Sequence, residues 1–266
     1  MSSSAANFVG SIPENYDTGL GPHIFEPYAA DLVRRACAIT PTDILELAAG
    51  TGIVSQALHA ALPQSASLVV TDLNEPMLEI AQSKISPAAN ASFQAVDACE
   101  LPFTDASFDL IVSQFGVMFF PDKAKSYREA ARVLRPKGRY MFSVWGSWSA
   151  NPFAQVTHQV VVRHFPQDPP GFYKVPFGYN DAAEIEGNLR AAGFASVEIE
   201  TVKFSDPIKS LEDFSRGLVF GNPVSQEIEE RGGDCNAVRD DVFDKLESEL
   251  GGVLELEALV INAFNE

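Results

Sequence analysis

The residues best suited to chemistry begin in a short turn that contains glycine. The segment ILELAAGTG runs from Ile44 to Gly52. Its apolar residues predict a buried strand, and Gly50 and Gly52 predict a tight turn into a helix that begins near Ile53. Glycine reaches dihedral angles that other residues avoid, and it lets a bulky ligand approach the backbone. The turn is therefore a candidate ligand site.

A carboxylate stands at the end of the next predicted strand, where residues 68–70 are followed by Thr71 and Asp72. An acidic residue at the tip of the second strand of a β-α-β unit can accept hydrogen bonds from both hydroxyls of a ribose. The pattern favours a ligand that contains a nucleoside. The glycine turn half-matches the G-x-G-x-x-G/A pattern of dinucleotide sites, so the identity of the ligand stays open at this point.

A second acidic residue follows a third predicted strand, at residues 91–95. The carboxylate of Asp97 could accept a hydrogen bond from an exocyclic amine, and Ala98 leaves room for a flat ring. An adenine would fit both features. A fourth predicted strand, at residues 110–113, leads to Gln114 and the residues after it.

Five segments, in this order and spacing, resemble the successive motifs of the class I S-adenosylmethionine-dependent methyltransferases. They read ELAAGTG, VVTDLNEPML, VDACELPF, FTDASFDLIVSQFGVMFFPD and REAARVLRPKGRYMFSVWG. The closest resemblance is to the small-molecule branch that includes the ubiquinone/menaquinone C-methyltransferases, and it covers residues 40–146. The chain departs from the family at Ala48 and Ala49, where the family often has glycine.

The resemblance implies an α/β fold with S-adenosyl-L-methionine as the cofactor. The expected fold is a Rossmann-like seven-stranded sheet whose last strand is antiparallel, flanked by helices, with a mostly helical cap formed by insertions. The cofactor-binding residues that the resemblance implies are Glu46, Ala48, Gly50, Gly52, Asp72, Leu73, Met77, Asp97, Ala98, Gln114 and Phe115. Glu46 would orient the turn or bind the amino group of the cofactor through water. The turn would contact the methionine part, and Asp72 would hold the ribose.

The remaining positions that the resemblance assigns surround the other parts of the cofactor. Leu73 and Met77 would press on the adenosine, residues 97–98 would meet the edge of the adenine, and residues 114–115 would line the floor beside the sulfonium.

The sequence contains no pattern that identifies a catalytic base or a metal site. Methyl transfer is an in-line displacement in which proximity alone can lower a barrier by ~7–11 kcal/mol. A base is needed only for a poorly ionised acceptor. The candidates for this role are His23, Tyr16, His158 and Tyr173, which fall in the predicted lid or cap. For each of them an ordinary packing role is favoured, and the aromatic residues of the cap hint at a flat, apolar acceptor.

Composition limits the other classes of function. The 266 residues, 46% of them hydrophobic, suit one large domain. A net charge of −17 argues against a nucleic-acid partner, because phosphate backbones need basic patches. The three cysteines, Cys37, Cys99 and Cys235, form no disulfide or metal pattern and suit a reducing compartment. With no signal peptide or membrane span in the sequence, we expect a cytoplasmic protein without a membrane partner.

We expect one domain with six parts along the chain. They are a lid arm (1–30), a Rossmann-like core (31–146), a cap insertion (147–180), a return to the core (181–204), a helical cap insertion (205–252) and the last core strand (253–266). The arm is rich in glycine and proline and is predicted to be extended or loop-rich. The region 211–250 predicts two helical segments separated by Gly232-Gly233, and its acidic part could form a homodimer contact, a solvated face or part of the cap.

Two alternatives stay open beside a small-molecule methyltransferase. A nicotinamide-dependent oxidoreductase would use the same glycine turn and Asp72, although the chain has no Tyr-x-x-x-Lys pair. A protein of the same fold could also bind the cofactor without transferring a methyl group, because catalysis by positioning leaves no signature in the sequence.

Overall fold

The computed structural model describes residues 4–85 and 90–266. The first three residues of the predicted arm, and residues 86–89 of the predicted core, lie outside the described residues. The strands are β1 (Asp43–Glu46), β2 (Ser67–Asp72), β3 (Ala91–Ala95), β4 (Phe108–Gln114), β5 (Leu134–Trp145), β6 (Ser196–Pro207) and β7 (Val253–Phe264). The main helices are α1 (Ile12–Asn15), η2 (Tyr16–Phe25), α2 (Glu26–Cys37), α3 (Ile53–Ala61), α4 (Glu75–Lys84), α5 (Lys123–Val133), α6 (Pro152–His164), α7 (Ala182–Ala191), α8 (Leu211–Phe220), α9 (Val224–Glu230) and α10 (Cys235–Leu250).

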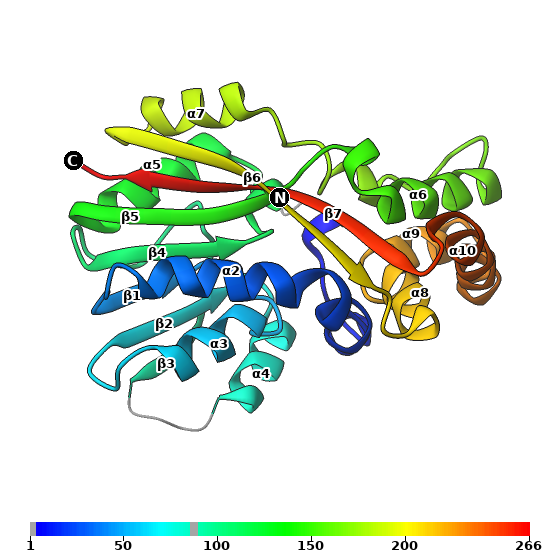
Figure 1. The fold of residues 1–266 in the computed structure, drawn as a ribbon, viewed down its shortest axis with the longest axis horizontal. Coiled ribbons are helices and arrows are strands. Elements are labelled where there is room, and N and C mark those ends of the chain that lie inside the picture. The colour runs from blue at the N-terminus through cyan, green and yellow to red at the C-terminus, as the bar shows by residue number, and fades with distance from the viewer. Residues whose placement is uncertain (1–3, 86–89) are drawn as a thin grey trace.

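The seven strands form one sheet in the order β3-β2-β1-β4-β5-β7-β6 (Figure 1). The strands from β1 to β5 pair in parallel, whereas β7 runs antiparallel to both β5 and β6. The predicted seven-stranded Rossmann-like sheet with an antiparallel last strand is therefore confirmed.

Both faces of the sheet are buried under helices. Ile44 and Leu110 pack with apolar residues of α2, α3 and α4, whereas their neighbours Leu45 and Ile111 pack on the opposite face with residues of α5 and α7. Successive side chains of a strand point to opposite faces, so a strand covered on both sides reads as a continuous apolar run. This explains why the central strands are easily recognised in the sequence.

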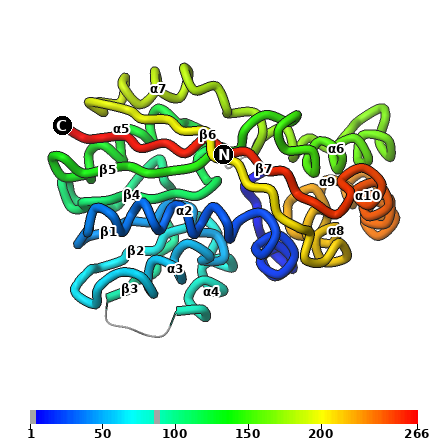
Figure 2. The backbone as a smooth tube through the Cα atoms, in the orientation of Figure 1, coloured from blue at the N-terminus to red at the C-terminus, as the bar shows by residue number. Residues whose placement is uncertain are grey.

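The cap is a group of helices at one end of the sheet, where β6 and β7 run past the shorter strands (Figures 1 and 2). It consists of α6, α8, α9 and α10, and α10 packs against both α6 and α8. The predicted break at Gly232-Gly233 is confirmed, because it separates α9 from α10, but the region contains three helices and not two, because Gly221 to Pro223 also separates α8 from α9. Proline cannot continue the hydrogen bonding of a helix interior, which accounts for the additional break.

The prediction of a loop-rich arm was also wrong. Helix α1 continues into η2, which is a π-helix, and η2 leads directly into α2. Gly19 of η2 packs against Gly217 of α8 so closely that a Cβ atom on Gly19 would lie 2.6 Å from the Cα atom of Gly217. Glycine at this position serves a close helix crossing and does not mark a loop.

Candidate functional site

Nine of the eleven predicted cofactor-binding residues line one cavity of about 200 Å³ at the carboxyl ends of the central strands. Those that line it are Ala48, Gly50, Asp72, Leu73, Met77, Asp97, Ala98, Gln114 and Phe115. Parallel strands end at the same edge of a sheet, and ligands of open α/β sheets bind outside that edge. Two predicted residues lie elsewhere: Glu46 is behind the cavity wall, and Gly52 begins helix α3.

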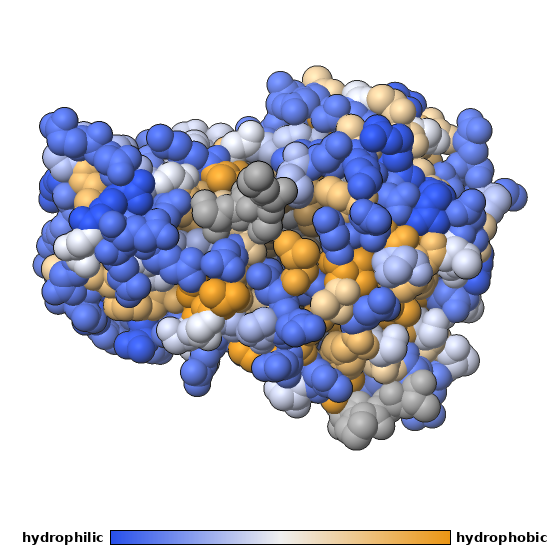
Figure 3. Space-filling model, turned by 180° about the vertical axis from the view of Figure 1, so that it is seen from behind, coloured by the Kyte–Doolittle hydropathy of each residue, from blue (hydrophilic) through white to orange (hydrophobic). Residues whose placement is uncertain are grey.

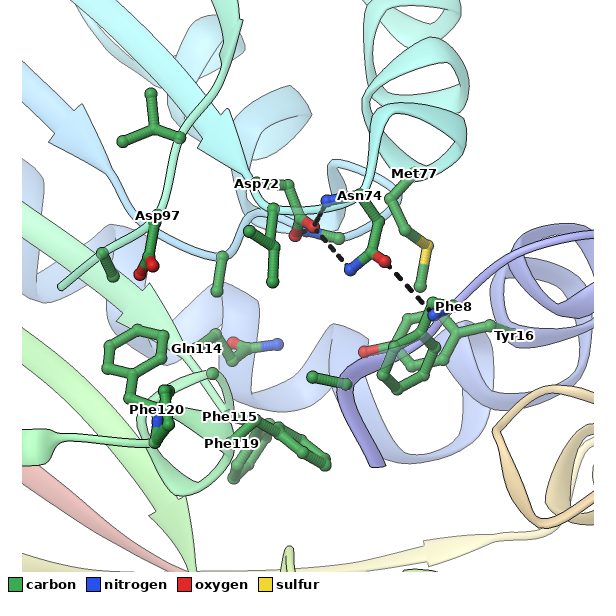
Figure 4. Close-up of a pocket in the computed structure, with 18 residues that line it drawn as sticks. Phe8, Tyr16, Asp72, Asn74, Met77, Asp97, Gln114, Phe115, Phe119 and Phe120 are labelled. Atoms are coloured by element: carbon green, nitrogen blue, oxygen red, sulfur yellow. Dashed lines mark hydrogen bonds between the residues drawn. The ribbon is translucent and has the colours of Figure 1, made fainter. Parts of the chain in front are cut away.

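Asp72, the last residue of β2, holds the neighbouring backbone in place (Figure 4). Its Oδ2 atom accepts a hydrogen bond from the backbone N–H of Gly50 at 2.8 Å. Its Oδ1 atom accepts from the backbone N–H of Asn74 at 2.8 Å and from the side-chain amide of Asn74 at 3.2 Å. Burial raises the pKa of this carboxyl group, and the backbone N–H groups oppose that shift. Each oxygen has two lone pairs, so Oδ2 keeps the capacity to accept a further bond from a ligand.

Glu46 and Gln114 share a smaller chamber that borders the cavity at Tyr16 and Ala48. Glu46 is buried, and burial raises the pKa of its carboxyl group to about 8, with a smaller contribution from the charge of Asp72. The Oε2 atom of Glu46 and the Oε1 atom of Gln114 have no hydrogen-bond partner among the described residues. Two such acceptors in one chamber fit a ligand group that carries several N–H donors, such as an ammonium group.

The two glycines of the turn have different roles. Gly50 lines the cavity with φ +58°, and a Cβ atom there would lie 3.9 Å from the ring of Tyr16. Gly52 has φ +80°, and its Cβ atom would lie 2.6 Å from the Cβ atom of Ala81 in α4. Glycine at position 52 is therefore required by its left-handed backbone and by the contact between α3 and α4.

Two residues of the cavity wall that are not glycine also have left-handed backbones. The φ angle is +52° at Ala48 and +53° at Phe115. Such conformations are costly for residues with a Cβ atom and are concentrated at functional sites. The ring of Phe115 stacks on that of Trp145 with centroids 3.8 Å apart and an interplanar angle of 4°.

The cavity also contains residues that the sequence patterns did not identify. Phe8 comes from the arm, Asn74 follows the end of β2, and Phe119 and Phe120 lie at the end of a short 3-10 helix (Val117–Phe119) that follows β4. The Oδ1 atom of Asn74 accepts a hydrogen bond from the backbone N–H of Phe8 at 3.3 Å, which ties the arm to the start of α4 (Figure 4). The apolar residues of the arm were a signal for a packed segment, but no sequence spacing links Phe8 to residue 74.

A second cavity, of about 70 Å³, lies between the core and the cap. Aromatic side chains dominate its lining, and they are Phe8, Tyr16, Phe25, Phe115, Phe119, Trp145, Phe153, Phe172, Tyr173 and Phe177. The two cavities have four of these residues in common, Phe8, Tyr16, Phe115 and Phe119. We call the second cavity the aromatic chamber. On the face opposite that of Figure 1, apolar side chains are scattered across the middle and right of a mostly hydrophilic surface (Figure 3).

The four candidate catalytic residues occupy different surroundings. Tyr16 lines both cavities, and its hydroxyl group points into the first (Figure 4). Tyr173 lines the aromatic chamber and donates a hydrogen bond to the carbonyl oxygen of Leu218 at 2.6 Å. Burial raises the pKa of both hydroxyl groups, so neither is a base.

The two histidines line neither cavity. His23 is buried between η2 and the start of α8, with Nδ1 2.8 Å from the carbonyl oxygen of Gly19. Its Nε2 atom accepts a hydrogen bond from the backbone N–H of Ser210 at 3.2 Å, so Nδ1 carries the proton. His158 packs against Trp148, with ring centroids 5.0 Å apart. Both rings are therefore packed away from the two cavities.

Neither a metal site nor a membrane-spanning helix is present in the described part of the chain. Within residues 4–85 and 90–266, no group of three or more His, Cys, Asp or Glu residues is placed to hold a metal ion. In the same residues, no helix is long and apolar enough to cross a membrane.

Comparison with known proteins gives consistent matches. A family model described as a methyltransferase domain matches residues 44–138. The demethylmenaquinone methyltransferase of Clavibacter sepedonicus is 31% identical over 179 residues, which make up 62% of this chain and 70% of that enzyme. The ubiquinone/menaquinone biosynthesis C-methyltransferase UbiE of Proteus mirabilis is 32% identical over 116 residues, or 42% of this chain and 46% of that enzyme. The second match thus spans less than half of its relative.

Solved structures support the fold. The YcgJ protein of Bacillus subtilis superposes with a TM-score of 0.57 at 20% sequence identity, covering 89% of this chain and 99% of that protein. At this level of identity the likeness concerns the fold alone.

Proposed function

The chain belongs to the class I S-adenosylmethionine-dependent methyltransferases, and we propose that it methylates a small, flat, apolar or aromatic metabolite bound in the aromatic chamber. The observation that carries this proposal is that four residues belong to the walls of both cavities. Phe8, Tyr16, Phe115 and Phe119 line both of them, so a cofactor in the first cavity would lie beside an acceptor in the second.

Within the first cavity, the free hydrogen-bonding groups support one orientation of the cofactor. The ribose would bind to Asp72, and the edge of the adenine would meet Asp97 and Ala98. The ammonium group of the methionine part would bind to the unpartnered oxygens of Glu46 and Gln114. These two acceptors fit that group because it offers several donors and a positive charge. When bound, the cofactor supplies an electrophilic methyl group that is activated by a positive sulfur.

The residues of the chain would position the two reactants and keep water away from them. The apolar walls of the aromatic chamber would exclude water, and the shared residues would hold the acceptor beside the first cavity. The hydroxyl group of Tyr16 stays protonated because burial and the charges of Asp72 and Asp17 raise its pKa. It can therefore orient an acceptor by donating a hydrogen bond, but it cannot remove a proton.

The alternatives differ in their support. An oxidoreductase is not favoured, because the matching family model and the relatives are methyltransferases. A quinone-like ring is a second candidate acceptor, since the relatives are named demethylmenaquinone methyltransferase and ubiquinone/menaquinone biosynthesis C-methyltransferase. The aromatic lining of the chamber suits such a ring as well as it suits other flat molecules.

Calorimetric titration tests the cofactor part of the proposal. S-adenosylmethionine and S-adenosylhomocysteine should bind at micromolar concentrations, whereas NADH should not bind. Asp72→Ala should weaken the binding of S-adenosylmethionine and of S-adenosylhomocysteine by roughly 10- to 100-fold, as expected for the loss of a hydrogen-bonded charged group. The exposed Asp105, which pairs with Arg132, provides the control, and Asp105→Ala should bind as the wild type does. Binding of NADH alone would contradict the proposal.

A further inference from the structure

The proposed orientation gives the ribose, the adenine and the ammonium group of the cofactor their binding residues, and it leaves the carboxylate of the methionine part without a donor. We propose, building on the function above, that the hydroxyl group of Tyr16 binds this carboxylate by donating a hydrogen bond to it. Tyr16 would then be a cofactor-binding residue that the arm supplies. The protein would distinguish ligands that carry the carboxylate from those that lack it.

Tyr16 lies where that carboxylate would be. The ammonium and carboxylate groups of an amino acid are bonded to the same carbon atom, so the position of one nearly fixes the position of the other. Tyr16 lines both the first cavity and the small chamber that contains the unpartnered oxygens of Glu46 and Gln114. A ligand whose ammonium group binds in that chamber therefore brings its carboxylate close to Tyr16.

The hydroxyl group of Tyr16 has a fixed position beside the glycine turn. It points into the first cavity (Figure 4), and a Cβ atom on Gly50 would lie 4.0 Å from the hydroxyl oxygen. The ring is stacked on Phe25 with centroids 4.8 Å apart, and Phe8 contacts it edge-on with centroids 5.8 Å apart. A donor that the protein already holds in place loses little freedom when it binds a ligand.

The wall of the first cavity offers few other side-chain donors to an anion. Among the described residues that line it there is no lysine, arginine or histidine. The side-chain amide of Asn74 already donates to Asp72 at 3.2 Å, and that of Gln114 donates to the carbonyl oxygen of a neighbouring residue, Phe25, at 3.1 Å. Figure 4 shows no hydrogen bond between Tyr16 and the other residues drawn, so its hydroxyl group is free to donate.

Three backbone N–H groups of the turn are engaged as well. That of Gly50 donates to Asp72 at 2.8 Å. That of Ala49 donates to the carbonyl oxygen of Thr71 at 2.9 Å, and that of Gly52 donates to the carbonyl oxygen of Ala49 at 3.0 Å. These three groups are not available to a carboxylate, which increases the importance of the nearby hydroxyl group.

The hydroxyl group would keep its proton beside the carboxylate. Burial raises the pKa of Tyr16, and the charges of Asp72 and Asp17 raise it further. The amino acid part of the cofactor carries one positive and one negative charge, so it adds no net charge beside Asp72. Hydrogen bonds to an ionised acceptor are roughly twice as strong as those between neutral groups. The single proton of the hydroxyl group can serve this carboxylate or an acceptor oxygen, and the neighbouring small chamber favours the carboxylate.

A comparison of two ligands tests this inference without turnover. Decarboxylated S-adenosylhomocysteine keeps the adenosine and the ammonium group of S-adenosylhomocysteine and lacks the carboxylate. In calorimetric titrations, Tyr16→Phe should weaken the binding of S-adenosylhomocysteine by roughly 10- to 100-fold, as expected for the loss of a hydrogen bond to a charged group. The same variant should bind the decarboxylated ligand as tightly as the wild type does. Equal effects on the two ligands, or a larger effect on the decarboxylated one, would overturn the inference.

Tyr28→Phe is the matched control. Tyr28 lines neither cavity, and its hydroxyl group donates to the carbonyl oxygen of Val202 at 3.2 Å. This variant should leave the affinities for both ligands unchanged. Tyr16→Phe keeps the ring that packs against Phe8 and Phe25, so retained binding of the decarboxylated ligand shows that the arm is still in place.

The same titrations separate this inference from the proposed function. A wild-type protein that binds neither S-adenosylmethionine nor S-adenosylhomocysteine would overturn the proposed function and the inference together. A wild-type protein that binds S-adenosylhomocysteine with an affinity independent of the carboxylate and of the hydroxyl group of Tyr16 would overturn the inference alone and leave the methyltransferase function intact.

Discussion

The carboxyl group of Glu46, at the end of β1, and the amide of Gln114, at the end of β4, line one small chamber with an unpartnered oxygen each. The amide nitrogen of Gln114 donates to the carbonyl oxygen of Phe25 at 3.1 Å. This bond orients the amide oxygen of Gln114 toward the chamber. Buried acceptors without partners are uncommon in folded proteins. If the cofactor binds in the first cavity as proposed, this pair gives the adjoining small chamber a place for its cationic group.

Binding of S-adenosylmethionine should release a proton from Glu46. Burial raises the pKa of this group to about 8, so the carboxyl group is mostly protonated at pH 7 before binding. A cation placed beside it favours the ionised form and lowers its pKa. Titration at pH 7 in buffers of different ionisation enthalpy should show release of close to one proton, and Glu46→Gln should abolish it. Equal proton release by wild type and variant would contradict the placement of the ammonium group.

Glu46 should also make the stability of the cofactor-free protein depend on pH. The pKa is about 8 in the folded state against 4.5 as the ordinary value, so folding favours the protonated form. The stabilisation is complete below pH 4.5 and is lost as the pH rises through about 8. Compared with Glu46→Gln, the wild type should match the variant near pH 5 and be less stable at pH 9. A tenfold change in the ionisation equilibrium corresponds to about 1.4 kcal/mol, so the difference in the free energy of unfolding should be several kcal/mol at most.

Chemical denaturation at the two pH values measures this difference. The exposed Glu79 provides the control, and Glu79→Gln should follow the wild type at both pH values. A Glu46→Gln variant that loses stability at pH 9 relative to the wild type would show that the carboxylate is stabilised by its surroundings, contrary to the prediction.

The crossing of η2 and α8 should control both stability and cofactor binding. A Cβ atom on Gly217 would lie 2.7 Å from the carbonyl carbon of Gly19, a contact that real side chains do not make. Gly217→Ala should therefore destabilise the protein by about 1–3 kcal/mol, as overpacking does. Cofactor affinity should fall as well, because Tyr16 belongs to the same helix as Gly19.

A substitution at a second glycine serves as a control, because it changes helix propensity without affecting this contact. A Cβ atom on Gly187 in α7 would meet open space, so Gly187→Ala should stabilise the protein by up to about 1 kcal/mol. Thermal denaturation and calorimetric titration provide the two measurements. Unchanged cofactor affinity in a folded Gly217→Ala variant would show that the arm does not act as a lid.

Ala48→Gly should not destabilise the protein, although most changes in a cavity wall do. The backbone of Ala48 is left-handed, with φ +52°. A left-handed conformation costs an alanine about 1–2 kcal/mol, whereas the added freedom of glycine in the unfolded chain costs about 0.5–1 kcal/mol. The free energy of unfolding should therefore rise by up to about 1 kcal/mol. Ala49→Gly, at a position without a left-handed backbone, should lower the free energy of unfolding. A lower free energy of unfolding in both variants would contradict this prediction.

The sequence by itself determined the core and the order of its motifs. The strands β1, β2 and β4 are short apolar runs buried on both faces, and the turn after β1 contains glycines at positions that need positive φ angles. Asp72 stands at the end of a strand, so its place at the carboxyl edge of the sheet follows from the chain direction alone. Such features are local, and a local pattern is visible in a sequence.

The tertiary structure decided the arm, the cap and the aromatic chamber. Gly19 marks a helix crossing because Gly217 lies against it, and nothing near Gly19 in the sequence indicates that contact. Phe8, Trp145 and Phe177 come from the arm, from β5 and from the segment between α6 and α7, and they meet only when the chain is folded. The lining of a cavity depends on side chains brought together across long separations. The sequence therefore predicted where the cofactor should bind, whereas the chemistry available to the acceptor became visible only in the folded structure.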